Sequence, residues 1–331
     1  MIETAPQPTC AGPTGPPLDD GAPAAPQTTV WLNGRVIPTD QAVVPVMSHA
    51  LHYGSAVFEG IRAYRGRHGT AVFRLTDHLH RLARSAAAYG IAVPYTTGEL
   101  RSAVHEVVAA SGLADAYIRP LVFRGTGSMG LDPSGTTVGV AIMAWRLDDY
   151  YRHQAGNSVA ATVSTWRRIP PNALVPRAKA AGHYLNSMLA KSEAQRHGFD
   201  EAIMLDERGL VCEASAMNVL CVLDGALHTP DTTPYVLDGI TRDTVLRLAR
   251  DLDLDVVAGD LTVSQLHQAS ELLLTGTGAR IAPVGQLDAT RFRAPGPVTT
   301  ALGRHFDLAV RGELPHLAHW LDAVAGTQGA G

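Results

Sequence analysis

The sequence predicts a mixed α/β or α+β fold made of two domains. The predicted strands come in groups with the helices set apart, which is not the regular alternation of a doubly wound sheet. The chain of 331 residues is also longer than a single hydrophobic core usually supports. A polar stretch, residues 147–157, is typical of a linker and divides a small N-terminal α/β domain, residues 28–146, from a larger C-terminal domain, residues 158–331.

The N-terminal segment, residues 1–27, is predicted to be disordered. It carries seven prolines and many alanines but only one leucine and one isoleucine. This composition offers too little apolar surface to offset the entropy that is lost on ordering. Order is expected to begin after this segment, where Asn33-Gly34 between alternating apolar residues predicts a β-hairpin.

Two amphipathic helices and two strands are predicted next. Apolar side chains recur at helical intervals within residues 75–90 and again within residues 97–112, and each segment ends at a glycine. The apolar runs at residues 116–125 and 138–145 have the composition of strands.

The second half is predicted to hold further strands and one clear helix. Residues 158–166 form a predicted strand, and Glu207-Arg208-Gly209 and Asp224-Gly225 predict two hairpins. A helix is expected from Thr241 onward because the residues after it space an apolar face at helical intervals. That face consists of Val245, Leu248, Ala249 and Leu252.

The composition argues against several classes of function. The net charge is -4 and there is no basic patch, so we expect no nucleic-acid partner. No apolar run approaches the ~18 residues of a membrane span, and the N-terminus lacks the features of a signal peptide, so we expect no membrane partner. Cys10, Cys212 and Cys221 form no C-x-x-C pair, which predicts no bound metal and a cytoplasmic location.

The segment "GTGSMG", residues 125–130, matches a dinucleotide-binding pattern literally. That pattern needs a helix that begins at its third glycine, so that a pyrophosphate meets the helix N-terminus. Here the turn-forming residues 131–135 follow and lead into a strand. We therefore expect a glycine loop, which could overhang an active site, rather than the nicotinamide site of a dehydrogenase.

Lys179 has unusual neighbours for a lysine. Residues 180–182 are Ala-Ala-Gly, which neither shield nor pair an ammonium but leave room for the backbone to approach a flat cofactor, although a lone lysine is more often a surface residue. Tyr184 follows as a phenol that can hydrogen-bond an oxyanion on such a cofactor. Lys191, in contrast, is expected on a solvated helix face. The bulkier residues nearby are expected to form a packed helix face: Leu185, Met188 and Leu189.

Three further segments are candidates for binding an anionic cofactor. Glu213 ends a short predicted strand, and residues 239–241 begin the predicted helix, where free N–H groups and the helix dipole favour an anion. The turn "TGTGAR", residues 275–280, could cradle a phosphate with its N–H groups. A solvated strand-end charge and a plain turn are the ordinary interpretations of Glu213 and of this turn.

Together these segments resemble the fold-type IV pyridoxal-phosphate aminotransferases, and specifically the branched-chain amino acid aminotransferases. The similarity runs from about residue 29 to the C-terminal region and departs from the family at Leu220, where Phe or Tyr is usual. Six blocks carry it in the family's order: "MSHALHYGSAVFEGIRAY" (47–64), "YIRPLVF" (117–123), "PRAKAAGHYLNS" (176–187), E-x-S-x-x-N (213–218), "LDGITR" (237–242) and "TGTGARIAPV" (275–284).

The resemblance implies a two-domain enzyme with pyridoxal 5'-phosphate at the domain interface. Lys179 matches the lysine that forms a Schiff base with the cofactor and then moves the substrate proton. Glu213 matches the carboxylate that faces the pyridine nitrogen, and Tyr184 matches the phenol beside the cofactor's 3-oxygen. The implied phosphate partners are Arg62, Ile240, Thr241 and Thr277.

The resemblance also implies the substrate contacts. Tyr117, with the N–H groups of Thr277 and Gly278, matches the site of the α-carboxylate. Arg119 matches the arginine that receives the distal carboxylate of glutamate, with a structural ion pair as the alternative. An apolar side-chain pocket would be lined by Phe58, Trp145 and Tyr184. The other subunit of an implied homodimer would lend Tyr53 and Leu131.

The implied reaction is the reversible transamination of leucine, isoleucine and valine with 2-oxoglutarate. D-amino acid aminotransferase and aminodeoxychorismate lyase share the fold and the cofactor and stay as alternatives, although "YIRP", residues 117–120, favours the branched-chain type. A binding protein descended from the enzyme would be expected to lack Lys179 or Glu213, and both are present.

Overall fold

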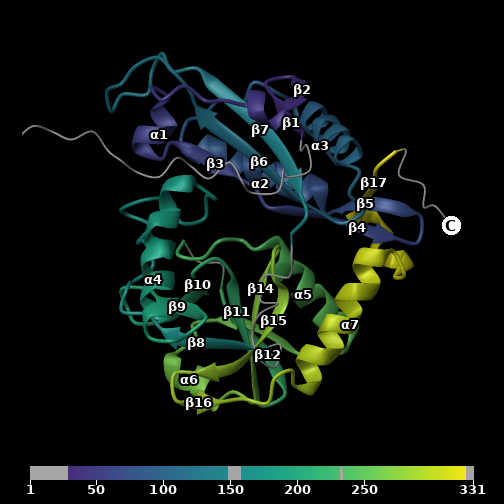
Figure 1. Ribbon diagram of the computed structural model, residues 1–331. Helices are drawn as coiled ribbons and strands as arrows, with labels where there is room; N and C mark the ends of the chain where they lie inside the picture. Colours follow the sequence, from purple (N-terminus) through teal and green to yellow (C-terminus); the bar gives the residue numbers. More distant parts are fainter. Residues whose placement is uncertain (1–28, 148–157, 232–233, 326–331) are drawn as a thin grey trace, which may run out of the picture.

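The computed structural model describes residues 29–147, 158–231 and 234–325 (Figure 1). The predicted tail, residues 1–27, lies outside the described residues, and so does the predicted linker apart from Leu147. Two β-sheets organise the described chain. In the view of Figure 1 the first sheet lies in the upper part of the molecule and the second in the lower part.

The first sheet is antiparallel throughout. Its strand order is β17-β5-β4-β6-β7-β1-β2, with β3 beside β6. Its strands are β1 (Thr29–Leu32), β2 (Arg35–Pro38), β3 (Ala56–Phe58), β4 (Ile61–Gly66), β5 (Gly69–Phe73), β6 (Ala116–Arg124), β7 (Val138–Trp145) and β17 (Leu321–Ala323). The predicted hairpin is confirmed, because Asn33 and Gly34 link β1 to β2 with positive φ angles of 48° and 94°.

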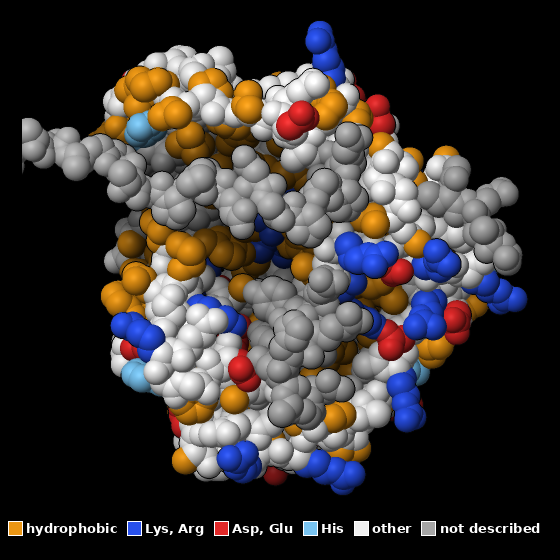
Figure 2. Space-filling model, in the orientation of Figure 1, with side chains coloured by type: hydrophobic (Ala, Val, Ile, Leu, Met, Phe, Trp, Pro, Cys, Tyr) orange, Lys and Arg blue, Asp and Glu red, His pale blue; other side chains and the backbone are white. Residues whose placement is uncertain are grey.

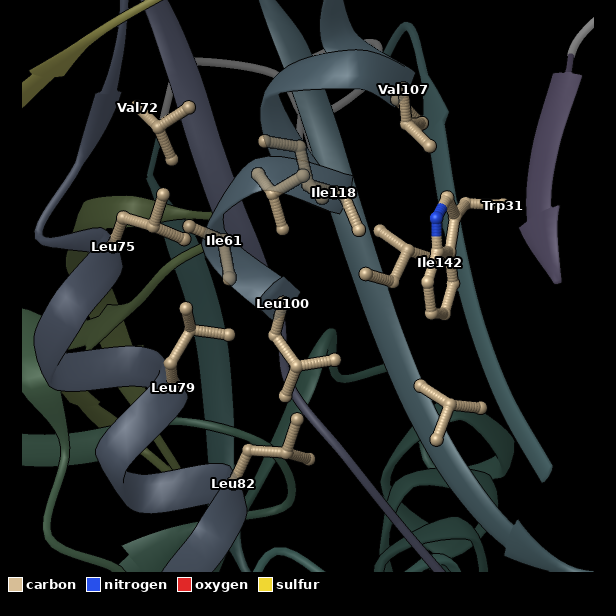
Figure 3. Packing of buried hydrophobic residues seen from close by; sticks show 14 of the residues in the cluster. Trp31, Ile61, Val72, Leu75, Leu79, Leu82, Leu100, Val107, Ile118 and Ile142 are labelled. Atoms are coloured by element: carbon tan, nitrogen blue, oxygen red, sulfur yellow. The ribbon is translucent and has the colours of Figure 1, made fainter. Parts of the chain in front are cut away.

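Helices α2 (Leu75–Ala88) and α3 (Thr97–Ser111) cover one face of the first sheet, as their apolar periodicity predicts. Figure 3 shows Leu79 and Leu82 of α2 turned toward Ile61 of β4 and Leu100 of α3. The Thr96 hydroxyl and the Glu99 carboxylate form a capping box that fixes where α3 begins. This packing leaves the other face of the sheet to the second half of the chain.

The second sheet is mixed, which confirms the predicted fold class. Its order is β10-β9-β8-β15-β14-β11-β12-β13, with β16 beside β15, and β8 is parallel to both of its neighbours. Its strands are β8 (Val159–Val163), β9 (Glu201–Leu205), β10 (Val211–Ala214), β11 (Asn218–Leu223), β12 (Ala226–Pro230), β13 (Val256–Gly259), β14 (Glu271–Gly276), β15 (Arg280–Leu287) and β16 (Thr290–Arg291). The two predicted hairpins are confirmed as the β9–β10 and β11–β12 turns.

Among the remaining helices, α1 lies beside the first sheet, and α4, α5, α6 and α7 lie around the second sheet (Figure 1). The α-helices are α1 (His49–Tyr53), α4 (Tyr184–Arg196), α5 (Ile240–Asp251), α6 (Val263–Gln268) and α7 (Pro297–Arg311), and the short 3-10 helices are η1 (Thr39–Gln41), η2 (Ala181–His183) and η3 (Pro315–Trp320). The helix predicted from Thr241 is confirmed as α5, which begins one residue earlier.

The core beneath α5 and α7 is shared by the two halves of the chain. Tyr64 and Phe73 of the first sheet pack in the same cluster as Leu248 of α5, Phe306 of α7 and Trp320 of η3. The segment after α7 then returns to the first sheet, where β17 pairs with β5. The predicted division assigns residues 158–331 to one domain, whereas the structure places β17 in the sheet formed by the N-terminal half.

Helix α4 differs from its prediction on two faces. The predicted packed face is exposed in this chain, with Leu185, Met188 and Leu189 at 64%, 54% and 46% of full exposure, because small residues such as Ala190 and Ala194 make the buried face instead. Lys191 does not lie on a purely solvated face, since its ammonium is 3.0 Å from the carboxylate of the buried Glu201.

Two other sequence features are settled by the fold. The "GTGSMG" segment, residues 125–130, lies in the loop between β6 and β7, and no helix begins at its third glycine, so the predicted glycine loop is confirmed. None of the described helices combines the length and the apolar composition needed to cross a bilayer.

Candidate active site

Two adjoining pockets lie between the first and second sheets. The charged pocket is lined by Arg81, Arg168, Glu213, the start of α5 and the turn after β14. The aromatic pocket is lined by Phe58, Tyr117, Arg119 and Trp145. Residues that line both pockets join them into one site: Lys179, Tyr184, Ala216, Met217, Gly276 and Thr277.

Lys179 stands at the junction of the two pockets, held by the first half of the chain. Its N–H donates to Ser85 Oγ at 2.9 Å, and its carbonyl accepts from the N–H of Phe58 at 3.0 Å. Its Nζ lies 2.6 Å from the Tyr184 hydroxyl. A lysine amine that contacts a phenol inside a pocket is suited to nucleophilic and proton-transfer chemistry.

The small residues after Lys179 serve a contact that the sequence did not reveal. Ala180 bridges to Val57 and is buried in the core of the first sheet, and a Cβ placed on Gly54 would lie 3.0 Å from Gly182 Cα. Small side chains therefore let the segment that carries Lys179 lie directly against the first half of the chain.

Glu213 is buried, so the interpretation as a solvated strand-end charge is wrong. Its Oε1 lies 2.6 Å from Nε of the buried Arg168, and its Oε2 accepts the N–H of Leu237 at 3.2 Å. A buried carboxylate needs such partners to keep its charge. Arg168 is a site residue that sequence reasoning missed, because one of two adjacent arginines in a loop carries no local signal.

His183 also lines the charged pocket and stays neutral there. Burial lowers the pKa of His183 to about 4, and the neighbouring positive charge of Arg168 acts in the same direction. Its Nε2 lies 2.6 Å from the Tyr89 hydroxyl at the end of α2. The ring therefore adds no positive charge to the charged pocket at neutral pH.

The aromatic pocket holds Arg119 among its rings. The guanidinium of Arg119 lies 4.5 Å from the ring centre of Phe58 and 5.7 Å from that of Trp145, and its Nη2 donates to the Tyr117 hydroxyl at 3.2 Å. Its buried Nε has no hydrogen-bond partner, and no carboxylate pairs with it, within residues 29–147, 158–231 and 234–325. A Cβ on Gly60 would lie 2.1 Å from the Tyr117 hydroxyl, so this position requires glycine.

Comparison with known proteins identifies the family. The model of the amino-transferase class IV family matches residues 56–287. This chain belongs to the class IV aminotransferases. It is therefore an enzyme, and the cofactor of its family is pyridoxal 5'-phosphate, as predicted.

Relatives of this class IV aminotransferase agree in sequence and in structure. It is 41% identical over 299 residues to a branched-chain-amino-acid aminotransferase of Salmonella typhimurium, covering 89% of this chain and 97% of that protein. A branched-chain aminotransferase of Thermoproteus uzoniensis, solved with norvaline, superposes with a TM-score of 0.86 at 40% identity and covers 90% and 99% of the two chains. A branched-chain amino acid aminotransferase from T.th., complexed with N-(5'-phosphopyridoxyl)-L-glutamate, gives a TM-score of 0.85 at 38% identity, with coverage of 90% and 99%.

The phosphate end of the cofactor fits the aminotransferase's charged pocket. Ile240 and Thr241 begin α5, and no side chain of the described residues caps that helix, so its first N–H groups remain available to an anion. Within the described ranges, Thr275 Oγ1, which lines this pocket, is a buried polar atom without a hydrogen-bond partner, and so is Nε of Arg62, which lies outside the pocket lining. A bound phosphate would satisfy donors of this kind.

The predicted site residues fall into three groups. The charged pocket brings together Lys179, Tyr184, Glu213, Ile240, Thr241 and Thr277, and the aromatic pocket adds Phe58, Tyr117, Arg119, Trp145 and Gly278. Three predicted residues line neither pocket: Arg62, Tyr53 and Leu131.

Tyr53 and Leu131 of the aminotransferase lie apart from both pockets on an exposed surface. Leu131 is 84% exposed, and the Tyr53 hydroxyl donates to the carbonyl of Met129 at 2.8 Å. His49 also contacts this loop, with Nε2 3.1 Å from the Gly130 carbonyl. Because the phenol hydrogen of Tyr53 is used within its own chain, Tyr53 can offer a substrate only its oxygen or its ring.

No cluster of three potential metal ligands occurs among the described residues.

Proposed function

We propose that this class IV aminotransferase exchanges the amino group of leucine, isoleucine or valine with 2-oxoglutarate, and that Lys179 holds its cofactor. The observation that carries the proposal is the position of Lys179, which lines both pockets and has its Nζ 2.6 Å from the Tyr184 hydroxyl. A group attached at Lys179 would meet a helix N-terminus on one side and an aromatic substrate pocket on the other.

The residues around Lys179 fit the roles that transamination requires. Pyridoxal 5'-phosphate, when bound, supplies a sink for the electrons released as the Cα–H bond breaks. Glu213, supported by Arg168, would hold a proton on the pyridine nitrogen, and Tyr184 would hydrogen-bond the 3-oxygen. The Lys179 amine would carry the proton away from Cα, because a base must lie within hydrogen-bond reach of the proton that it moves.

The aromatic pocket supports two kinds of substrate. A branched side chain would pack on Phe58 and Trp145, whereas the γ-carboxylate of glutamate would be desolvated there at a cost of several kcal/mol without a partner. Arg119 lies among these rings with Nε unsatisfied by the described residues, so it is placed to receive that carboxylate. The two related structures hold one ligand with an apolar, unbranched side chain, norvaline, and one with a γ-carboxylate, phosphopyridoxyl-L-glutamate.

We also propose that two copies of the chain form a dimer. Figure 2 shows apolar side chains over α1 and over α4, on either side of the gap between the two parts of the molecule. The exposed apolar residues of this surface include Leu51, Leu131, Leu185 and Met188. Exposed apolar patches of this kind mark interaction sites, and a second copy would bring Tyr53 and Leu131 toward a neighbouring pocket. The cytoplasmic location stays a prediction.

One spectroscopic experiment tests the proposed reaction. The purified holoenzyme is mixed separately with L-leucine, L-glutamate and D-alanine, and the absorbance of the bound cofactor is followed. Conversion to the pyridoxamine form is expected with L-leucine and L-glutamate only. Conversion with D-alanine alone would support a D-amino acid aminotransferase, and no conversion with any amino donor would contradict transamination.

A further inference from the structure

Helix α2 carries a line of polar residues that connects the start of α5 with the segment that carries Lys179. Arg74, His78, Arg81, Ser85 and Tyr89 follow one another at intervals of three or four residues, so they share one face from the N-cap to the C-cap of the helix. We call them the α2 stripe. The first four are buried polar residues, which is costly unless each has a partner.

The centre of the α2 stripe is an ion pair sealed from solvent. Arg81 donates from Nε and Nη2 to the two oxygens of Glu59, at 2.6 and 2.8 Å, and His78 Nδ1 lies 2.7 Å from Oε2. Burial alone would raise the pKa of Glu59, but Arg81 and His78 outweigh it and hold that pKa well below its usual range. Burial lowers the pKa of His78 although Glu59 acts in the opposite direction, whereas Glu59 outweighs burial at Arg81, raises its pKa and keeps it the cation of the pair.

The stripe reaches the start of α5 through two arginines. Arg81 Nη1 donates to the carbonyl of Asp238 at 2.7 Å, directly before the N-cap residue of α5. Arg74 Nη1 donates to the carboxylate of Asp243, in the first turn of α5, at 2.5 Å and to the hydroxyl of Thr244, the next residue, at 3.0 Å. Two cations of one helix therefore hold the N-terminus of another on both sides of its first N–H groups.

The far end of the stripe reaches the segment that carries the reactive lysine. Ser85 Oγ accepts the N–H of Lys179 at 2.9 Å. Tyr89 contacts His183 Nε2 at 2.6 Å, and its hydroxyl accepts the N–H of Val175 at 3.2 Å. A single rigid helix thus contacts the backbone at Lys179 and the backbone at the start of α5.

We propose that the α2 stripe sets the distance between the lysine and the phosphate-binding end of α5, with Arg81 as its central positioning residue. The inference rests on the proposed role of Lys179. A cofactor attached at one end and bound through its phosphate at the other needs both anchors at a fixed separation. Preorganised donors bind an anion without the cost of moving into place.

Arg81→Lys tests the phosphate end, because lysine keeps the charge but loses the planar fork that reaches Glu59 and Asp238 together. Apoenzyme is titrated with pyridoxal 5'-phosphate and, separately, with pyridoxal, which has no phosphate. The affinity for pyridoxal 5'-phosphate is expected to fall by on the order of ten- to a hundredfold, the size of one charge-assisted hydrogen bond. The affinity for pyridoxal is expected to change little.

Two further variants and one control variant complete the test. Arg74→Lys, at the second contact with α5, is expected to show the same selective loss and replaces Arg81→Lys if that variant does not fold. Ser85→Ala is expected to leave the affinity unchanged but to shift the spectroscopic pKa of the cofactor attached at Lys179. Arg101→Met removes an exposed ion pair with Asp322 and is the control, with no change expected in either titration.

The outcomes separate this inference from the proposed function. Equal losses for pyridoxal 5'-phosphate and pyridoxal in the arginine variants, or no loss for either, would overturn the inference and leave the stripe as a structural contact. If the wild-type chain binds no pyridoxal 5'-phosphate at Lys179, found by borohydride reduction and peptide mapping, the proposed function fails and the inference fails with it.

Discussion

The charged pocket and the aromatic pocket treat their cations in opposite ways. In the charged pocket Arg168 is paired with Glu213, and Arg81 is paired with Glu59, at 2.6 Å in both cases. In the aromatic pocket Arg119 contacts rings and one phenol, and no carboxylate of the described residues pairs with it.

The proposed function accounts for this difference. A permanently held cofactor presents the same groups in every cycle, so the protein can complete their surroundings in advance. A substrate pocket that accepts an apolar side chain and then a carboxylate has to keep one cation uncommitted, because a pre-formed ion pair would compete with the incoming carboxylate. Aromatic rings stabilise such a cation without neutralising it.

The largest effect is expected at the junction of the two pockets. Lys179→Ala should lower turnover by several orders of magnitude, because it removes both the cofactor's attachment and the base that moves the proton. Borohydride reduction and peptide mapping of the wild type should find the pyridoxyl adduct on Lys179. Lys191 is the chain's only other lysine and serves as the internal control. An adduct on Lys191 would contradict the assignment.

A smaller loss of turnover is expected from a substitution in the charged pocket. Glu213→Gln should keep the cofactor but lower turnover by at least about ten- to a hundredfold, because a neutral amide replaces a charge-assisted hydrogen bond of roughly 1.5–3 kcal/mol. Turnover and cofactor content are measured on the same preparation. Wild-type turnover in Glu213→Gln would show that Glu213 only pairs with Arg168 and has no role in the reaction.

A selective loss is expected at the aromatic pocket. Arg119→Met should slow the glutamate half-reaction by about tenfold or more while changing the leucine half-reaction only a few-fold, since only glutamate brings a second carboxylate. Stopped-flow measurement of the two half-reactions gives the ratio directly. Equal losses would mean that Arg119 holds the α-carboxylate or the fold, and the contrast between the pockets would disappear.

Tyr53→Phe is expected to slow the glutamate half-reaction as well, but less than Arg119→Met does. The substitution removes the hydrogen bond to the Met129 carbonyl and loosens the loop that carries Leu131. We expect the glutamate half-reaction to slow by a few-fold, with fold and cofactor content unchanged. The same two half-reactions are compared, and a larger loss with leucine would place Tyr53 on the apolar side of the pocket.

The smallest expected effect concerns pH. The pKa of His183 falls from 6.5 to about 4 on folding, so the unfolded chain binds a proton that the folded chain does not take up. His183 should therefore make the fold less stable as the pH falls from about 6.5 to about 4, and not above that window. Thermal unfolding across this range should show a weaker pH dependence in His183→Gln. An unchanged slope would assign the dependence to other groups.

Sequence reasoning found residues that carry a local signal and missed those defined by contact. Lys179 was recognisable from its neighbours and Glu213 from its block, and α2 from its apolar periodicity. Arg168 has no such signal, and its importance comes from the fold placing it against Glu213. The α2 stripe has a readable spacing, but polar residues at helical intervals usually indicate a solvated face.

Burial of apolar residues was also misjudged on α4, at the surface where we propose a second chain. Leu185 and Met188 have the spacing of a packed face, and a rule based on periodicity assigns such a face to the chain's own core. The structure buries Ala190 and Ala194 instead, because small side chains let α4 approach the second sheet closely. Periodicity shows that a face is apolar but does not show which molecule covers it.

The pairing of β17 with the first sheet affects how the chain folds during synthesis on the ribosome. Strand β5 ends at Phe73, yet its edge partner β17 begins only at Leu321. During synthesis at about 5–20 residues per second, the edge of β5 stays unpaired until nearly 250 further residues have been added, which is on the order of ten seconds or more. An open strand edge is a place where nascent chains pair with the wrong partner. A ribosome that stalls after α7 would therefore release a chain with this edge exposed, and such a fragment should be a substrate for chaperones.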